Sequence, residues 1–407
     1  MSKLVGNKPT LYIITDMSTT LMSNYARLPV TFVRGEGAWL WDTQGARYLD
    51  ALSGIAVCGL GHAHQAITAV ICEQANQLLH TSNLYGIAHQ EALADALVRI
   101  TGMESAFFGN SGAEANEAAL KLARLYGHHQ GYKRPTVIVT EGSFHGRTLA
   151  TLTASGNPKI QAGFEPLVEG FIRVPYNDVN AIAEIAKQHT EVVAVLVEPI
   201  TGEGGIVIPA ADYLANLRAL CDQNNWLFML DEIQTGMGRT GQWCAYQHTD
   251  IMPDVLTLAK GLGNGVPIGA CLARGKAAQV FQAGNHGSTF GGNPFVCRVA
   301  RAVIETIEQE NLLQRVQQLE QRFYQGFSKA LAGIASVQAL RVKGLMIGIE
   351  LDRPCSQLMS QALEKQLLIN VTAGRVIRLL PPFILSDTQA DEIIATVSHL
   401  IHSFVNA

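Results

Sequence analysis

Several features are absent from this sequence of 407 residues, and each absence argues against a class of protein. Charged residues make up only 16% of the chain and form no basic stripe, so neither nucleic acid nor an anionic membrane is expected as a partner. No apolar run reaches the roughly 18 residues that a membrane-spanning helix needs. The first residues lack the apolar core of a signal peptide. We therefore expect a soluble, cytoplasmic protein.

The seven cysteines also lack a pattern. Their number is odd, they are scattered, and no two of them form a C-x-x-C pair. In a chain of this length such a set is typical of reduced, mostly buried thiols, and we expect no metal site. What the chain does have is apolar material: hydrophobic residues make up 48%, which is enough for a large core.

From about residue 90 to residue 231, short apolar or β-branched runs alternate with segments of helical period. The runs predict strands at 105–108, 136–140, 192–197 and 226–230, and the segments between them predict helices near 90–100, 113–126, 178–189 and 211–225. Such alternation implies right-handed crossovers and a mostly parallel sheet, which is an α/β fold.

The two ends of the chain have a different pattern. Before residue 55, short alternating segments separated by glycines predict an antiparallel meander, preceded by a helix or arm over about 1–30. A helix is expected near 65–80. After residue 294 the sequence predicts a long helical stretch with a break near 310–311, followed by strands at 345–351 and 376–380 and helices near 356–366 and 387–403. This part is an α+β tail.

One aspartate and one lysine stand where a sheet could present them to a ligand. Asp231 ends an apolar run, and Lys260 stands between an apolar approach and a glycine-rich turn. Ligands bind at the carboxyl ends of strands in open α/β sheets, and a desolvated lysine is more often neutral and nucleophilic. The pair is compatible with a Schiff-base lysine and an acid that holds a protonated pyridine nitrogen, as in sites for pyridoxal 5'-phosphate. Taken alone, a surface lysine and a helix-capping aspartate explain the two residues more simply.

Ser111, Gly112 and Ala113 stand between a predicted strand and a long helix. Ser111 can cap this helix, Gly112 permits close approach of a ligand, and the free N–H groups could then bind a phosphate. A plain helix cap is the alternative.

The loop after the strand at 136–140 contains Phe144, His145 and Arg147. Phe144 could stack on a planar ring, and Arg147 could bind a carboxylate with its planar guanidinium. The alternatives are a core phenylalanine and a solvated arginine, and His145 is interpreted as a hydrogen-bonded loop histidine.

Two glutamates follow the strand at 192–197. We favour a pocket position for Glu203, because Arg378 offers it a partner, whereas no role is assigned to Glu198. Ser288 and Thr289 lie in a loop of small residues that could bind phosphate. The glycines after Lys260 do not match the spacing of a dinucleotide-binding loop, and no clear strand precedes them, so we expect no dinucleotide site there.

Together these segments resemble the class III pyridoxal-phosphate aminotransferases, and among them the acetylornithine aminotransferases. The resemblance runs from about residue 24 to the C-terminus, and its motifs are 110–116, 144–147, 198–200, 231–241, Lys260 and 286–294. It implies fold type I: a large cofactor-binding domain over 56–293, and a small α+β domain built from residues 1–55 and 294–407. It also implies a homodimer with shared active sites.

The resemblance also implies roles for individual residues. Lys260 would hold pyridoxal 5'-phosphate and carry a proton, and Asp231 would keep the pyridine nitrogen protonated. The other cofactor contacts would be Gln234 at the phenolic oxygen, Phe144 on the ring, and Ser111, Gly112 and Ala113 at the phosphate, joined by Thr289 of the partner subunit.

For the substrates, the resemblance implies that Arg147 binds a carboxylate of both donor and acceptor, that Arg378 binds the α-carboxylate of glutamate, and that Glu203 masks Arg378 when the donor is bound. Ser288 would line the pocket. Ile55 stands where ornithine aminotransferases carry a tyrosine, which favours an acylated amine, although Tyr25 matches a tyrosine of those enzymes.

The function implied is transfer of the δ-amino group of N2-acetyl-L-ornithine to 2-oxoglutarate, in arginine biosynthesis, with a succinylated diaminopimelate-pathway substrate as a second donor. Succinylornithine, ornithine and 4-aminobutyrate aminotransferases are the alternatives within the class. A cofactor-binding protein without turnover is the alternative outside it.

Overall fold

The computed structural model describes residues 20–406, so most of the expected N-terminal arm lies outside the described residues. A seven-stranded sheet has the order β4-β10-β9-β8-β7-β5-β6. β10 pairs antiparallel with β4 and β9, and the other pairings are parallel. The strands are β4 (Ser105–Gly109), β5 (Thr136–Thr140), β6 (Phe171–Val174), β7 (Val192–Val197), β8 (Leu227–Asp231), β9 (Val255–Leu258) and β10 (Gly269–Ala273). The predicted mostly parallel α/β sheet is confirmed.

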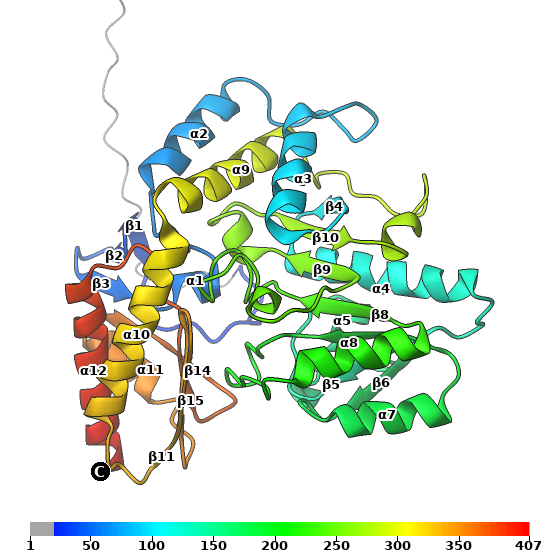
Figure 1. Ribbon diagram of the computed structural model, residues 1–407. Coiled ribbons are helices and arrows are strands. Elements are labelled where there is room, and N and C mark those ends of the chain that lie inside the picture. Colours follow the sequence, from blue (N-terminus) through cyan, green and yellow to red (C-terminus); the bar gives the residue numbers. More distant parts are fainter. Residues whose placement is uncertain (1–19, 407) are drawn as a thin grey trace, which may run out of the picture.

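Helices cover both faces of this sheet (Figure 1). Because side chains alternate along a strand, Leu196 and Met229 face the layer that contains α4, whereas Val195 and Phe228 face the layer of α3, α7 and α8. The helices of this part are α2 (Gln65–Ala75), α3 (Ala88–Thr101), α4 (Gly112–His129), α5 (Leu149–Ala154), α6 (Pro158–Gln161), α7 (Val179–Gln188) and α8 (Tyr213–Asn224), with 3₁₀ turns at Ala245–His248, Lys260–Leu262 and Ala277–Gln279.

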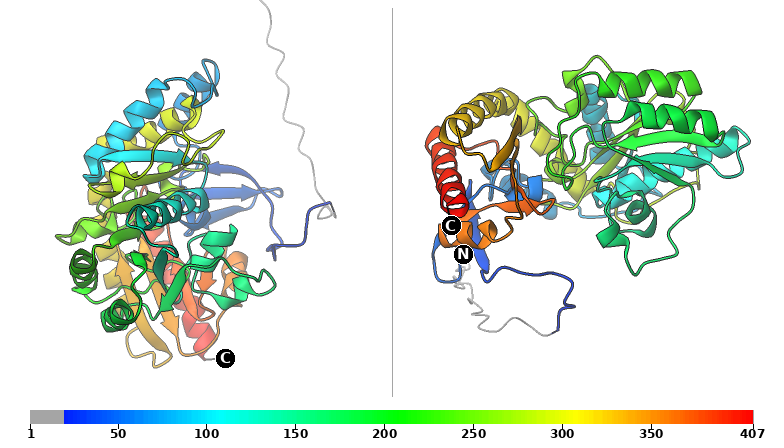
Figure 2. Two further views of the ribbon diagram at one scale, coloured as in Figure 1. Left: turned by 90° about the vertical axis from the view of Figure 1, so that its right-hand side faces the viewer. Right: turned by 90° about the horizontal axis from the view of Figure 1, so that it is seen from below.

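The two ends of the chain build a second region with two four-stranded sheets, ordered β1-β2-β3-β13 and β11-β12-β15-β14. β13 pairs parallel with β3 and so joins the C-terminal part to the N-terminal meander. Figure 2 shows α10 and α12 on the side of this region that faces away from the seven-stranded sheet. The strands are β1 (Phe32–Glu36), β2 (Trp39–Asp42), β3 (Arg47–Asp50), β11 (Val337–Lys343), β12 (Met346–Leu351), β13 (Leu367–Leu368), β14 (Asn370–Thr372) and β15 (Val376–Leu379).

The helices of the second region are α9 (Pro294–Gln309), α10 (Leu312–Ala330), α11 (Leu358–Glu364) and α12 (Asp387–Val405), and a short turn, α1, covers Ser53–Ala56. The expected break near residue 310 is present, because Asn311 has a left-handed φ of 53° between α9 and α10. α9 contributes to both cores: Val303 packs with the second region and Ile304 with the large sheet. The domain division at residues 55 and 293 stays a prediction.

Two expectations about elements were wrong. A strand, β9, does precede the glycines after Lys260; it is only four residues long and contains Thr257, so its apolar pattern is weak. α2 ends at Ala75 rather than His80, and the following Leu78 and Leu79 are exposed. No helix in the described part of the chain has the length and apolar character that crossing a membrane requires.

Candidate active site

The carboxyl ends of five parallel strands meet at one edge of the large sheet. The loops after β4, β5, β7, β8 and β9 contribute to a cavity of about 380 Å³. Its walls include most of the residues singled out in the sequence: Ser111, Gly112, Ala113, Phe144, Arg147, Glu203, Asp231, Gln234 and Lys260. Within residues 20–406 no group of three or more histidines, cysteines or acidic residues is arranged to hold a metal ion.

The N-terminus of α4 opens onto this cavity. Ser111 caps the helix, since its Oγ accepts a hydrogen bond from the N–H of Glu114 at 3.2 Å. The N–H groups of Gly112 and Ala113 belong to the first helical turn, where no intrahelical acceptor exists, and they are available to an anion. Gly112 packs tightly against Ile233, since a Cβ at 112 would lie 2.8 Å from Cδ1 of Ile233 and one of the two residues would have to shift.

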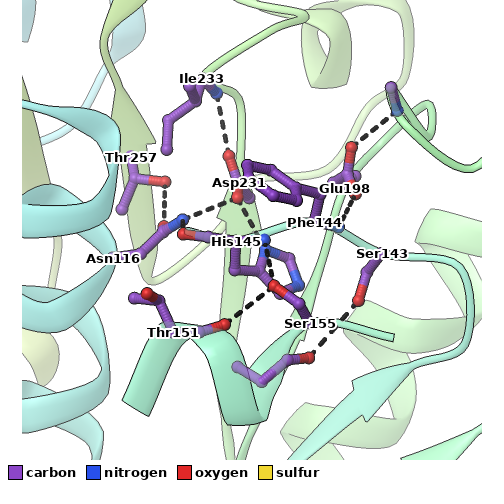
Figure 3. Close-up of polar contacts among 12 residues, drawn as sticks. Asn116, Ser143, Phe144, His145, Thr151, Ser155, Glu198, Asp231, Ile233 and Thr257 are labelled. Atoms are coloured by element: carbon purple, nitrogen blue, oxygen red, sulfur yellow. Dashed lines mark hydrogen bonds and ion pairs between the residues drawn. The ribbon is translucent and has the colours of Figure 1, made fainter. Parts of the chain in front are cut away.

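Asp231 lies at the end of β8 with its carboxylate held by three donors (Figure 3). Its Oδ2 accepts from Nδ2 of Asn116 at 2.8 Å and contacts Nδ1 of His145 at 2.7 Å, and its Oδ1 accepts from the N–H of Ile233 at 3.0 Å. Because an ionised carboxylate only accepts, Nδ1 of His145 carries the hydrogen. The interpretation of His145 as a hydrogen-bonded loop histidine fits this geometry, and its partner is Asp231.

Lys260 is half-buried and lies in the wall of the cavity. Its backbone has a φ of 44°, a left-handed conformation that bends the chain directly after β9. Burial lowers the pKa of the Lys260 amine, and the nearby positive charge of Arg378 lowers it further, against the opposing effect of Glu203, Asp231 and Glu198. A lowered pKa leaves more of the amine neutral and therefore nucleophilic.

Phe144 and Arg147 lie on the loop after β5. The Arg147 guanidinium is exposed, and its carbon lies 5.6 Å from the centre of the Phe144 ring. This places a planar cation at the mouth of the cavity, where it can bind a carboxylate that enters from solvent.

Glu198 follows β7 and also lines the cavity, although no role could be assigned to it from the sequence. Its carboxylate accepts from the N–H groups of Phe144 at 2.8 Å and Gly202 at 2.7 Å. Burial raises the pKa of Glu198 to about 7, and the negative charge of Asp231 adds to the rise, whereas the two N–H donors oppose it. Near neutral pH this group therefore exchanges a proton readily.

Glu203 and Arg378 form the ion pair that the sequence suggested. Nη1 of Arg378 lies 2.6 Å from Oε1 of Glu203, and Nη2 donates to Oδ1 of Asn370 at 2.8 Å. The side chain of Arg378 is 1% exposed, whereas that of Glu203 is 37% exposed and lines the cavity. The arginine is thus fixed behind the wall, and the glutamate covers it.

Five expected site residues do not line this cavity: Arg378, which lies behind Glu203, and Ser288, Thr289, Tyr25 and Ile55. Ser288 Oγ accepts from Nδ2 of Asn110 at 3.3 Å, which keeps it beside the α4 loop. Thr289 is exposed, and Tyr25 is 71% exposed. Ile55 packs beside a small buried cluster at the left-handed turn α1, where its own φ is 67°. Such a φ is strained for a β-branched residue.

The family model for class-III aminotransferases matches residues 21–401. The chain belongs to this family. An acetylornithine aminotransferase of Nitrosomonas europaea is 57% identical over 387 residues, which cover 95% of this chain and 98% of that protein. Acetylornithine aminotransferase 1 of Bordetella bronchiseptica is 52% identical over 96% of this chain and 99% of that protein.

Solved structures agree on the fold. The ornithine aminotransferase of Toxoplasma gondii superposes with a TM-score of 0.91 at 33% identity, covering 94% of this chain and 93% of that chain. The acetylornithine aminotransferase of Elizabethkingia anophelis gives 0.85 at 36% identity, covering 94% and 96%. Fold type I, expected from the sequence resemblance, is therefore confirmed.

A class-III aminotransferase depends on pyridoxal phosphate, and this cofactor expectation is confirmed. The residues of the cavity fit the group. The α4 N-terminus offers free N–H donors for a phosphate, Asp231 can pair with a protonated ring nitrogen, and Lys260 supplies an amine. Oε1 of Gln234 is buried without a hydrogen-bond partner among the described residues, which leaves an acceptor for a ring hydroxyl.

Sequence reasoning missed two polar residues behind Asp231. Asn116 is fully buried in α4 and contacts Asp231, and Thr257 of β9 donates to Oδ1 of Asn116 at 2.8 Å. Signals for both exist: Asn116 stands four residues after Gly112, on the same helix face, and Thr257 interrupts an apolar strand. Neither signal shows that Asp231 is the residue these two side chains hold in place.

Proposed function

We propose that this aminotransferase transfers the δ-amino group of N2-acetyl-L-ornithine to 2-oxoglutarate, as part of arginine biosynthesis. The observation that carries the choice of substrates is the masked arginine. Arg378 is buried behind Glu203 at the wall of the cavity that contains Lys260. A donor amine at the end of a side chain brings no α-carboxylate to this place, whereas glutamate does. The names of the similar acetylornithine aminotransferases support the same donor.

Different residues of the cavity bind the cofactor and move the proton. When bound, pyridoxal phosphate supplies an aldehyde that bonds to amines and a ring that withdraws electrons. Ser111, Gly112 and Ala113 hold its phosphate, and Asp231 pairs with the ring nitrogen. Nζ of Lys260 removes a proton from the substrate carbon that bears the amino group, and its lowered pKa favours the neutral amine that this role needs.

Two arginines sort the substrates by their carboxylates. The exposed Arg147 binds the α-carboxylate of acetylornithine and the distal carboxylate of 2-oxoglutarate. Arg378 takes the α-carboxylate of glutamate once Glu203 has moved aside, which the partial exposure of Glu203 allows. With acetylornithine, Glu203 stays on Arg378 and the cation is neutralised.

We also infer a homodimer in which Thr289, with Ser288 beside it, completes the site of the partner subunit. Thr289 is exposed and does not line the cavity of its own chain, and Phe290 next to it is 60% exposed. An exposed aromatic side chain beside an unused phosphate-binding hydroxyl is typical of a surface that a second copy covers.

Mixed dimers test this arrangement. Lys260→Ala removes the amine, and Thr289→Asp places a negative charge against the phosphate, so each variant alone should be inactive. A hybrid of the two recovers one intact site if Thr289 acts across the interface. No recovery, with hybrid formation verified by mass, would place Thr289 in the site of its own chain.

The donor is tested by single half-reactions of the holoenzyme with a panel of amines, followed by the change in cofactor absorbance. We expect acetylornithine to react faster than succinylornithine, ornithine, 4-aminobutyrate or N-succinyldiaminopimelate. A faster reaction with ornithine would contradict the assignment and the argument from Ile55. No absorbance change with any amine would leave only a cofactor-binding protein.

We infer a cytoplasmic location from the thiols. All seven cysteines are free, and five of them are buried. Reduced thiols of this kind persist where the surroundings are reducing.

A further inference from the structure

We propose that Asn116 is a positioning residue that, with Thr257 behind it, keeps the Asp231 carboxylate ready to hold a proton on the cofactor's ring nitrogen. The inference rests on the proposed role of Asp231 and extends it to two residues that do not touch the cofactor. All three side chains are buried, and the contacts join α4, β9 and β8 (Figure 3).

The Asp231 carboxylate has one acceptor position left for a ligand. A carboxylate offers about four lone pairs to donors. Three positions of Asp231 are filled, by Nδ2 of Asn116, by Nδ1 of His145 and by the N–H of Ile233. The position left on Oδ1 can accept from a ring N–H. Every donor already in place stabilises the ionised form, so the proton shared with the ring is held on the ring nitrogen.

The Asn116 amide can take only one of its two orientations. On one side lie two acceptors, Oδ2 of Asp231 and the carbonyl oxygen of His145, each 2.8 Å from Nδ2. On the other side the Thr257 hydroxyl donates to Oδ1 at 2.8 Å. A flipped amide would set its oxygen against two acceptors. The two acceptors therefore fix the face that Asn116 presents to Asp231, and the Thr257 hydroxyl holds the amide in place by donating to its oxygen.

Asn116 lies on the same helix as the N–H groups that face the phosphate. It follows Gly112 by one helical turn, so the two residues share a face of α4. Gly112 in turn lies against Ile233, whose N–H is bound to Asp231. The same helix thus presents N–H groups to the phosphate and an amide to the acid at the opposite end of the ring. One rigid helix, α4, therefore sets the distance between the N–H groups that face the phosphate and the amide that holds Asp231.

The test measures where the proton lies. Each holoenzyme is loaded with pyridoxal phosphate labelled with ¹⁵N in the ring, and the pH at which the ring nitrogen loses its proton is followed by the nitrogen chemical shift. Loss of one hydrogen bond to a charged group corresponds to roughly a tenfold change, so we expect Asn116→Leu to lower this midpoint by about one pH unit. Thr257→Val should lower it in the same direction, and Thr257→Ser, which keeps the hydroxyl, should restore it.

Thr306→Val is the matched control. Thr306 is buried and donates to the carbonyl oxygen of Ala302 at 2.7 Å in α9, so its loss should lower the melting temperature and leave the midpoint unchanged. If Asn116→Leu fails to fold, the Thr257 pair decides the question alone. An unchanged midpoint in both Asn116→Leu and Thr257→Val would overturn the inference.

Asp231→Asn separates this failure from failure of the proposed function. If the ring nitrogen loses its proton in Asp231→Asn but stays protonated in Asn116→Leu and Thr257→Val, only the inference is wrong. If Asp231→Asn has no effect on the midpoint, Asp231 does not pair with the ring nitrogen, and both fall together.

Discussion

Replacing Glu203 with glutamine removes the charge that faces Arg378 while keeping the size of the side chain and one acceptor oxygen. In the native protein Nη1 of Arg378 lies 2.6 Å from Oε1 of Glu203. The arginine is buried and has a second acceptor in Asn370, whereas its Nε has no hydrogen-bond partner among the described residues. The substitution therefore leaves a buried cation that is only partly compensated.

The size of the effect follows from the kind of contact. A hydrogen bond to a charged group contributes about 1.5–3 kcal/mol, and a neutral acceptor retains roughly half of this. Because the side chain of Glu203 is 37% exposed and solvent screens it, we expect a loss of about 1 kcal/mol in the free energy of unfolding. The same amount no longer opposes the uncovering of Arg378, so the KM for glutamate should fall by about fivefold to tenfold.

The assay is a pair of half-reactions of the holoenzyme, one with glutamate and one with acetylornithine, together with a melting curve. The variant should bind glutamate more tightly and discriminate less against donors that carry a free α-carboxylate at that end. Glu305→Gln is the matched control, because the side chain of Glu305 is 38% exposed and pairs with Arg301 at 3.0 Å in α9. An unchanged or increased KM for glutamate in the Glu203 variant would refute the masking argument.

Three other substitutions test the remaining walls of the cavity. Gly112→Ala should weaken cofactor affinity by about tenfold or more in a titration of the apoenzyme, because the new Cβ would lie 2.8 Å from Ile233 and displace the start of α4. Unchanged affinity would mean that the Ile233 loop moves to make room for the methyl group. Arg147→Ala should raise the KM for acetylornithine and for 2-oxoglutarate by about tenfold each in steady-state assays, through loss of a charge-assisted contact; an effect on only one of them would contradict shared use. Glu198 has a raised pKa, so its folded form binds a proton more tightly than the unfolded chain, and stability should fall as pH rises from about 4.5 to about 7. Glu198→Gln should reduce this slope in melting temperatures, and an unchanged slope would exclude Glu198 as its source.

The sequence predicts elements well where local pattern and final environment agree. Continuous β-branched runs at 136–140 and 192–197 gave strands with the observed bounds, because both strands are almost wholly buried in the sheet. β10 was not foreseen, since Gly269–Ala273 is built of small residues with weak strand preference and is held by hydrogen bonds to β4 and β9. Its pairing depends on neighbours distant in the chain, which a local pattern does not contain.

The residues of the candidate site, like the elements of the fold, could be predicted only where the local pattern determines their position. Residues that end an apolar strand, such as Asp231, could be placed at the ligand edge because parallel strands bring their carboxyl ends together. Asn116 could not be assigned to Asp231, because the residue that α4 presents to β8 depends on how the helix crosses the sheet. Ile55 illustrates a third limit: its left-handed φ of 67° comes from a turn over Ser53–Ala56 in which every φ is positive, and of these four residues only Gly54 favours that conformation.

The charges around the cavity are unevenly distributed. Glu203 and Arg378 neutralise each other, and the raised pKa of Glu198 and the lowered pKa of Lys260 both favour neutral forms. Asp231 then contributes negative charge to one part of the lining, and the N–H groups at the start of α4 and the exposed Arg147 contribute positive potential to other parts. On the proposed roles, a molecule with a cationic ring nitrogen and an anionic phosphate would place the nitrogen at Asp231 and the phosphate at the start of α4. A chain with few charged residues thus places opposite potentials in different parts of one cavity, and we propose that this separation sets the direction in which the cofactor binds.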